Sequence, residues 1–193
     1  MKEHSVNLLN NFIGGWYLED LSICDELIDF HKDNPNKSLG STSNGIDKTI
    51  KDSVDTSLTS NDIISSKYVS ALQTVLVEYV KKYSYCAHYS SFEIVQAISL
   101  QAYPLNGGYH TWHTERTGVT YPETTRHLVF MTYLNDVTDH GETEFFHQDL
   151  KIKPEKGLTI IWPADWTFTH RGVPSATQEK MIITGWYNFI PRY

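Results

Sequence analysis

Residues 93–103, Glu-Ile-Val-Gln-Ala-Ile-Ser-Leu-Gln-Ala-Tyr, mark the point in the chain where the hydrophobic period changes from about 3.6 to about 2. β-Branched and aromatic residues also become more frequent here, which is typical of a strand. Further strands are predicted at 110–115, 126–134, 142–147, 158–162, 167–170 and 180–189. Short strands with no helical pattern between them favour an antiparallel sandwich or jelly roll over a parallel sheet with crossover helices.

The residues before this point predict two helices and a polar connection. From Asp20 to His31, and again from Ile64 to about Lys82, apolar residues recur at three- and four-residue steps, which indicates an amphipathic helix. The stretch 32–62 is rich in Ser, Thr, Asn, Asp and Lys, so we expect a mobile surface loop. A lid or a substrate-facing hairpin is the alternative for this stretch.

Length and charge narrow the class of protein. The chain has 193 residues, 40% of them hydrophobic, which suits one globular domain with a sizeable core. Its 16 basic and 23 acidic residues give a net charge of −7 without any basic run, which argues against nucleic acid as a partner. There is no apolar stretch of about 18 residues for a membrane span, and Cys24 and Cys86 suggest no disulfide framework. We therefore expect a cytoplasmic protein.

The segment Tyr103-Pro-Leu-Asn-Gly-Gly-Tyr-His-Thr-Trp-His-Thr-Glu115 carries the first candidate site. On a strand, His113 and Glu115 point the same way and His110 points opposite. A second imidazole on that side would complete a 2-His-1-carboxylate set, which suits non-haem Fe(II). The pair alone is also compatible with an ordinary polar strand surface. In a helix, His110 and His113 would be neighbours instead, but the preceding Gly-Gly and the β-rich surroundings argue against a helix.

Two later residues are candidates to join this site. His170 ends an aromatic, β-prone run and is followed by a turn, a suitable place for a ligand at a barrel mouth. Lys180 shares a strand face with Ile182, Thr184 and Trp186, and burying its ammonium group unpaired would cost several kcal/mol. A carboxylate partner for Lys180 is therefore implied if that face points inward. Taken singly, His170 could be structural and Lys180 a solvated edge charge.

Residues 96–189 together resemble the Fe(II)- and 2-oxoglutarate-dependent dioxygenases of the prolyl 4-hydroxylase-like branch. The motifs follow in the order of that family: Tyr-x-x-x-Gly-Gly, His-x-Glu, the run 126–136, Gly-Glu-Thr-Glu-Phe at 141–145, the run 154–163, Thr-His-Arg-Gly-Val-Pro, and Lys-x-x-x-Thr-Gly-Trp. The chain looks most like short stand-alone members from phages and marine microbes. The resemblance implies a double-stranded β-helix, the cupin-like jelly roll, over 91–193, with residues 1–90 as helical support and polar loop on one face, all in one domain (1–193).

The resemblance also implies roles for individual residues. His113, Glu115 and His170 would hold Fe(II), and Lys180 would pair with the distal carboxylate of 2-oxoglutarate. Further cosubstrate contacts would come from the Tyr103 hydroxyl, the Thr184 hydroxyl and, in the pocket wall, Trp186. Most members of the family have Asp where this sequence has Glu115, which moves the carboxylate outward by about one bond, a change that a shifted strand or rotamer has to absorb.

The activity that the resemblance implies is hydroxylation of a substrate C–H bond with O2, coupled to conversion of 2-oxoglutarate to succinate and CO2, with ascorbate as a possible supporting reductant. The leading substrate is a peptidyl proline or another amino-acid side chain. The alternatives are a small metabolite or free amino acid, or a catalytically idle jelly roll that only binds a ligand. Residues 116–125 and 32–62 are candidates to close over the substrate. The oligomeric state is not predicted.

Several other residues have an ordinary structural interpretation. Arg171 follows a candidate ligand on a strand and should face away from the metal, at the rim or in solvent. Glu142 and Glu144 could mimic paired acid–base carboxylates, but a place in the barrel wall is preferred. Core and rim packing is preferred over a sugar platform for Trp162 and Trp166. Polar positions without a metal role are His127, His140 and His147.

Overall fold

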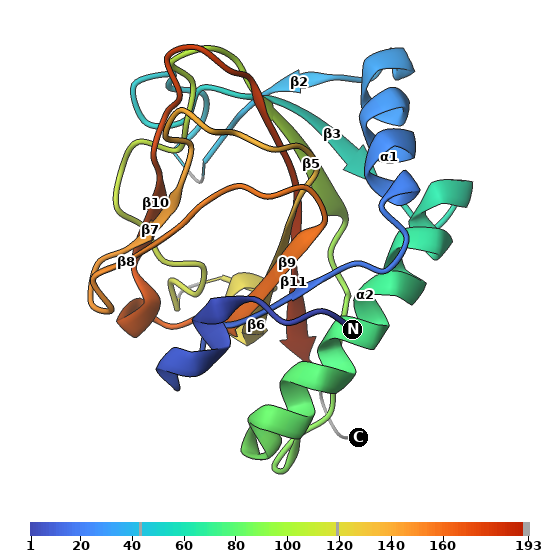
Figure 1. The fold of residues 1–193 in the computed structure, drawn as a ribbon, viewed down its shortest axis with the longest axis vertical. Helices are drawn as coiled ribbons and strands as arrows, with labels where there is room; N and C mark the ends of the chain where they lie inside the picture. The colour runs from blue at the N-terminus through green and yellow to red at the C-terminus, as the bar shows by residue number, and fades with distance from the viewer. Residues whose placement is uncertain (43, 119, 191–193) are drawn as a thin grey trace.

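The computed structural model describes residues 1–42, 44–118 and 120–190, which form two antiparallel sheets with two helices against the larger one (Figure 1). The large sheet contains β1 (Gly14–Tyr17), β2 (Ser38–Leu39), β3 (Val54–Leu58), β4 (Phe92–Glu93), β5 (Ile98–Tyr103), β6 (Arg126–Tyr133), β9 (Leu158–Pro163) and β11 (Lys180–Phe189). The small sheet contains β7 (Thr143–Phe145), β8 (Leu150–Ile152) and β10 (His170–Gly172). The helices are α1 (Ser22–Asp33) and α2 (Ile63–Lys82). Short 3-10 turns occur at Ser5–Leu9, Ser84–Ala87, Glu123–Thr125 and Trp166–Phe168.

Strand order in the large sheet is β1-β9-β6-β11-β5-β3-β2, with β4 pairing the far end of β11. The small sheet has the order β10-β7-β8 and lies on the side away from the helices (Figure 1). Neighbouring strands are therefore mostly distant in sequence, as in a double-stranded β-helix. The two sheets form an open jelly roll rather than a closed barrel, and this confirms the predicted fold class.

Alternation along the central strands separates two cores. On β11, Met181 and Ile183 pack beneath the helices, whereas Ile182 faces the small sheet. On β6, Phe130 likewise packs in the helix-side core and Met131 in the core between the sheets. The helix-side core is large because α1 and α2 bury their apolar stripes on the sheet, with the fully buried Leu27, Tyr68, Leu72 and Val75. The second core lies between the sheets and includes Tyr133, Phe145, Ile160 and Trp162.

The two predicted helices are confirmed, with α1 two residues further along the chain than expected. Among the described residues, no helix has the length and apolar character needed to cross a bilayer.

Three predicted strands need correction. Residues 110–115 do not form a strand: Tyr109 and His113 each make a single β-bridge, to Lys51 and His170. The predicted strand 93–103 is split into β4 and β5, and the strand expected at 167–170 is a 3-10 turn followed by β10.

Part of the polar stretch 32–62 is in the large sheet. The β3 strand lies antiparallel to β5, with Val54 opposite Ala102 and Leu58 opposite Ile98. β1 is likewise a strand that the sequence pattern does not predict, and it pairs with β9. The N-terminal segment therefore supplies strands as well as helices. Ser43 and Val119, in the two stretches expected to close over a substrate, lie outside the described residues.

Candidate metal and cosubstrate site

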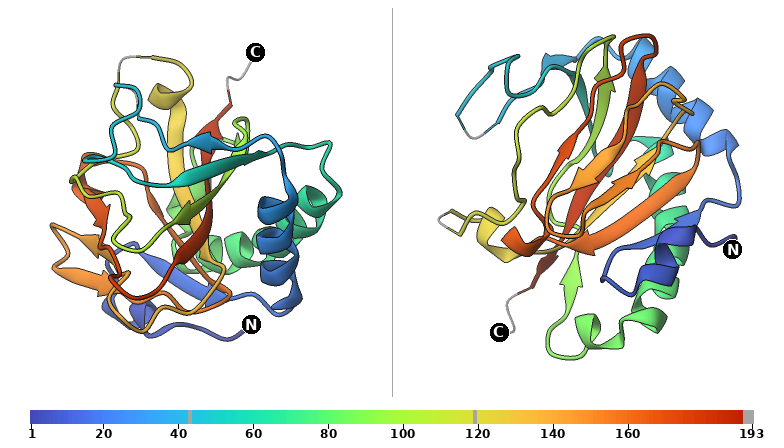
Figure 2. Two further views of the ribbon diagram at one scale, coloured as in Figure 1. Left: turned by 90° about the horizontal axis from the view of Figure 1, so that it is seen from above. Right: turned by 60° about the vertical axis from the view of Figure 1, so that its left-hand side comes forward.

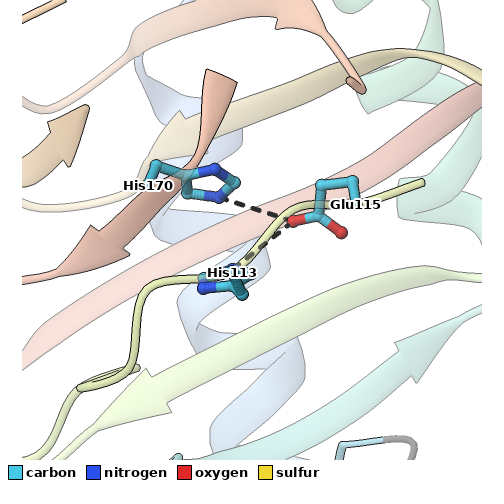
Figure 3. Close-up of side chains that lie close together, drawn as sticks. All are labelled: His113, Glu115 and His170. Atoms are coloured by element: carbon cyan, nitrogen blue, oxygen red, sulfur yellow. Dashed lines mark ion pairs between the residues drawn. The ribbon is translucent and has the colours of Figure 1, made fainter. Parts of the chain in front are cut away.

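His113, Glu115 and His170 converge on one point at the edge between the two sheets (Figure 3). One ligand atom from each lies within 4.8 Å of the others. The Oε1 atom of Glu115 is 3.7 Å from Nε2 of His113 and 3.5 Å from Nε2 of His170. Two imidazole nitrogens and one carboxylate oxygen are a donor set suited to a non-haem divalent iron. The residues are thus arranged to fit a metal ion, with the longer Glu115 side chain in place of the usual Asp.

Backbone pairing sets this convergence. His113 and His170 face each other across a β-bridge in which each main-chain N–H donates to the other's carbonyl, at 3.0 Å in both directions. Residues 57 positions apart in sequence are held side by side in this way. The bridge extends the edge of the small sheet by one residue, which places Glu115 two residues beyond it.

The rings are also held in one orientation. Nδ1 of His113 lies 3.0 Å from the carbonyl oxygen of Thr111, and Nδ1 of His170 lies 3.0 Å from that of Phe168. Because a carbonyl only accepts, Nδ1 carries the proton in both rings and the Nε2 lone pair faces Glu115. In addition, the Tyr109 ring stacks on His113 with 3.6 Å between centroids and 9° between planes. This tautomer is the one that a metal at the common point requires.

The second oxygen of Glu115 is held by the chain itself. Oε2 accepts a hydrogen bond of 2.9 Å from the Trp186 indole nitrogen and lies 3.6 Å from the Arg126 guanidinium. Arg126 stacks on the Trp186 ring, 3.5 Å from its centroid, and donates to the Glu115 carbonyl. One carboxylate oxygen is therefore fixed by protein contacts, which leaves Oε1 directed at the two imidazoles.

The charges at this point suit a divalent cation. Burial alone would raise the pKa of Glu115, but its interactions with the two imidazoles hold that pKa well below its usual range. Burial, together with the neighbouring His170, lowers the pKa of His113. Near neutral pH the carboxylate is ionised and the His113 ring is neutral, the protonation states that metal ligation needs.

Lys180 is buried, with 5% of its surface exposed, and its side chain reaches the same cavity as the three converging residues. Its Nζ donates to the carbonyls of Gly141 (2.8 Å) and Val173 (3.5 Å). Among the described residues it has no ion-pair partner, although Glu142 is near enough to raise its pKa in part; burial dominates and lowers that pKa to about 8. A buried ammonium facing a cavity without a carboxylate in contact fits an anionic ligand, as the sequence predicts for an inward-facing lysine.

The other predicted cosubstrate residues line this cavity too. The Tyr103 ring lies 5.1 Å from the Lys180 ammonium, and β5 sets Tyr103 directly opposite Lys180 on β11. The Tyr103 hydroxyl donates to Gln101 Oε1 at 2.6 Å. The Thr184 hydroxyl donates to the carbonyl of Phe130 at 2.9 Å, so its proton is directed to the main chain. Trp186 is placed beside Glu115 rather than beside Lys180.

The cavity that contains these groups has a volume of about 640 Å³. It extends from the buried Lys180 past the three converging residues to Ser41, Thr42 and Thr117. These outer residues belong to two irregular segments that lie on the same side of the molecule (Figure 2). The cavity therefore opens to solvent between the two segments that the sequence suggests as closing elements.

Other chemistry-bearing residues lie elsewhere. Arg171 forms an ion pair with Glu144 and reaches only the rim of the cavity, as expected for a side chain pointing away from the ligands. Glu144 also pairs with Lys151, so it is part of a surface ion-pair network rather than an acid–base pair. Trp162 is buried and Trp166 exposed, in agreement with core and rim packing.

Two residues of the site have contacts that sequence reasoning did not find. The sequence pattern assigns no role to Arg126 or to Tyr109. The only available signal was position: Arg126 begins β6, and Tyr109 follows the Gly-Gly pair four residues before His113.

An open jelly roll with two histidines and a carboxylate at its mouth defines a class, the non-haem iron oxygenases. Residues 98–188 match the sequence model of the 2OG-Fe(II) oxygenase superfamily. Residues 98–188 thus form a 2OG-Fe(II) oxygenase domain, the domain type of 2-oxoglutarate-dependent dioxygenases, which use Fe(II), 2-oxoglutarate and O2. This confirms the resemblance seen in the sequence. No curated protein sequence matches the chain significantly.

Solved structures show the same fold at low sequence identity. Viral collagen prolyl hydroxylase from Paramecium bursaria Chlorella virus-1, in a 2-oxoglutarate complex, is 20% identical with a TM-score of 0.69, over 94% of this chain and 98% of that one. A Pseudomonas putida prolyl-4-hydroxylase is 14% identical with a TM-score of 0.73, over 95% and 96%. A Trichoplax adhaerens prolyl hydroxylase in complex with a hypoxia-inducible-factor peptide fragment is 15% identical with a TM-score of 0.71, over 95% and 86%. The fold is prolyl hydroxylase-like.

Proposed function

We propose that this protein hydroxylates a peptidyl proline, or another amino-acid side chain within a polypeptide, while it converts 2-oxoglutarate and O2 into succinate and CO2. The observation that carries the proposal is that three side chains able to ligate a metal and one buried lysine lie in a single open cavity. An idle binding module would have no need for this combination.

The metal would be held by Nε2 of His113, Oε1 of Glu115 and Nε2 of His170. Bound there, Fe(II) supplies the activation of O2, for which three protein ligands leave coordination positions open. The role of the chain is to fix these ligands. The Thr111 and Phe168 carbonyls set the tautomers, and Trp186 orients the carboxylate. Partners of this kind typically change metal affinity by 10- to 100-fold.

Lys180 would bind the distal carboxylate of 2-oxoglutarate. Two of its three N–H donors point at the Gly141 and Val173 carbonyls, so one remains for the ligand. Tyr103, stacked near the ammonium, would lend its hydroxyl once that group turns from Gln101. The Thr184 hydroxyl would accept a hydrogen bond from the ligand or form part of the cavity wall, because it donates its own proton to the Phe130 carbonyl. The end of 2-oxoglutarate opposite to this distal carboxylate would then face the metal ligands.

A polypeptide substrate is favoured by the cavity's shape. Its volume of about 640 Å³ exceeds what a five-carbon dicarboxylate fills, and its outer part is bounded by the exposed Ser41 and Thr117. A side chain can enter between these segments while its backbone stays outside. The Trichoplax prolyl hydroxylase, whose structure contains a bound peptide fragment, supports the same substrate class.

The test is a succinate assay on the purified, Fe(II)-loaded protein with 2-oxoglutarate, O2 and ascorbate. We expect succinate to form faster when a proline-containing peptide is added, and the peptide to gain the mass of one oxygen atom. Lys180→Met is the control that should lose turnover at low 2-oxoglutarate. Stimulation by free amino acids but by no peptide would favour the metabolite hydroxylase, and no succinate under any condition would favour the idle module.

A further inference from the structure

Four ring side chains form a continuous exposed ridge on the small-sheet side of the molecule. We call Trp112, Phe146, His147 and Trp166 the aromatic ridge. Neighbouring rings meet edge to face, with centroid distances of 5.2 Å from Trp112 to Phe146, 5.2 Å from Phe146 to His147 and 5.6 Å from His147 to Trp166. Trp112 is 37% exposed, Phe146 59% and Trp166 65%. Large contiguous apolar surfaces of this kind on a monomer mark interaction sites more often than single exposed residues do.

Hydrogen bonds to the main chain fix the segments that carry the aromatic ridge. The N–H of Phe146 donates to the Thr169 carbonyl at 2.9 Å, which ties the end of β7 to the turn that carries Trp166. The Gln148 side chain donates to the Thr167 carbonyl at 3.0 Å from the same side. A ligand on the ridge would therefore not have to order the surface it binds, which lowers the entropic cost of binding.

The ridge is continuous with the rim of the active-site cavity. Trp112 directly precedes His113 in the chain, and Arg171 directly follows His170. The Arg171 guanidinium lies over the Trp112 ring, 4.4 Å from its centroid, and also lines the cavity. A chain leaving the cavity on this side would therefore meet Arg171 and Trp112 first and the other rings next.

The charges around the ridge point to an uncharged ligand. Glu144 pairs with both Arg171 and Lys151, at 2.8 and 3.3 Å, so the adjoining positive groups are compensated. With a net charge of −7 on the whole chain, an anionic lipid surface or nucleic acid gains nothing here. Uncharged, preformed polyproline II segments are recognised by rows of exposed aromatic rings.

We propose that the aromatic ridge binds a proline-rich segment that flanks the hydroxylated residue of a polypeptide substrate. This inference rests on the proposed function, because it extends the substrate beyond the cavity. At about 3.1 Å per residue, the three ring-to-ring steps can span at most roughly five residues of polyproline II. Affinity should therefore increase as a flank is lengthened to about five residues and then level off.

The kinetic test compares a blocked tripeptide, Ala-Pro-Ala, with a 15-residue proline-rich peptide of which it is the centre. We expect Trp166→Ala and Phe146→Ala to raise KM for the long peptide at least fivefold, with KM for the tripeptide and kcat for both unchanged. Trp166→Phe should retain most of the affinity, since a ring face remains. Tyr85→Ala, which removes a ring of comparable exposure (72%) in the 3-10 turn Ser84–Ala87, is the matched control and should change nothing.

A binding experiment provides a readout that does not depend on turnover. Calorimetric titration of metal-free protein with a 15-residue polyproline peptide should show binding that Trp166→Ala weakens at least fivefold and that Tyr85→Ala leaves unchanged. If no peptide stimulates succinate release, the proposed function fails, but this titration still tests whether the aromatic ridge binds a proline-rich peptide. If peptides are hydroxylated but the ridge variants leave KM and Kd for the long peptide within twofold of wild type, the ridge proposal alone is overturned.

Three other results would also overturn the proposal. Equal loss for the tripeptide and the long peptide would mean that the variants damage the cavity. A dimer in sedimentation that dissociates on Phe146→Ala would identify the ridge as a contact between two copies of the chain. Binding of a maltohexaose probe that depends on Trp166, without binding of polyproline, would identify a glycan platform.

Discussion

The charge state of Lys180 should control the affinity for 2-oxoglutarate between pH 7 and 9. Burial lowers the pKa of this lysine to about 8, so about nine-tenths of it is protonated at pH 7 and about one-tenth at pH 9. If only the ammonium form binds the distal carboxylate, the apparent Kd at pH 9 is about tenfold above its low-pH limit. The hydrogen bond to a charged group contributes about 1.5–3 kcal/mol, which is enough to allow a change of this size.

The assay is an anaerobic titration of the Fe(II)-loaded protein with 2-oxoglutarate, followed by the charge-transfer absorption of the complex. Lys180→Met should have the weak affinity already at pH 7, roughly 10- to 100-fold above the wild-type Kd, and no slope up to pH 9. Lys153→Met, the change of an exposed lysine, is the control and should follow the wild type. A wild-type Kd that is flat from pH 7 to 9, or a slope that persists in Lys180→Met, would refute this assignment.

Further predictions concern the metal, the folded state and the buried charge. Trp186→Phe removes the donor to Glu115 and should weaken Mn(II) affinity about tenfold or more, measured by electron paramagnetic resonance; unchanged affinity would contradict the orienting role. Metal content after dialysis should fall only below the ordinary histidine pKa of about 6.5, because burial lowers the pKa of His113; a midpoint above that ordinary value would count against ligation by this ring. Leu72→Ala, at a fully buried position in α2, should cost about 2–5 kcal/mol in urea unfolding without loss of metal, and a smaller cost would mean that α2 adds little to the core. Since the folded-state pKa of Lys180 lies below its unfolded value, metal-free wild type should gain stability relative to Lys180→Met as pH rises from 8 toward 10, and an opposite trend would exclude the lowered pKa.

The two faces of β11 could be predicted from the sequence because successive residues of this strand lie in different environments. Lys180, Ile182, Thr184 and Trp186 lie on the cavity side as predicted, and the intervening apolar residues pack beneath the helices. A long central strand with neighbours on both sides leaves little freedom for another arrangement, so the local period decides the structure.

The short strands β1 and β3 could not be predicted from the sequence because they are stabilised by pairing with strands that are distant in the chain. β1 begins with Gly14 and Gly15, residues of low strand propensity, and exists through its pairing with β9. A side chain at Gly14 would come within 3 Å of the Trp16 and Tyr79 rings, so close packing explains that glycine. The sequence of β3 is polar at its three central residues, 55–57, and one of them, Asp55, forms an ion pair with the buried Lys51.

The site shows the same division. The residue types at 113, 115 and 170 were predictable from their motif, but the local period wrongly predicted a strand around His113. That segment is irregular and is held in place by bridges to Lys51 and His170. The hydrogen bond from Trp186 to Glu115 joins residues 71 positions apart, and no local sequence pattern predicts such a contact.

The central claim is that His113, Glu115 and His170 share one metal ion beside Lys180. The most direct measurement is a crystal structure of the protein with Mn(II) and 2-oxoglutarate, read by anomalous scattering at the manganese edge. We predict one strong peak within about 2.0–2.3 Å of the two Nε2 atoms and of Glu115, with a carboxylate of 2-oxoglutarate on the Lys180 ammonium. A peak bound by other residues, or 2-oxoglutarate density away from Lys180, would contradict the account.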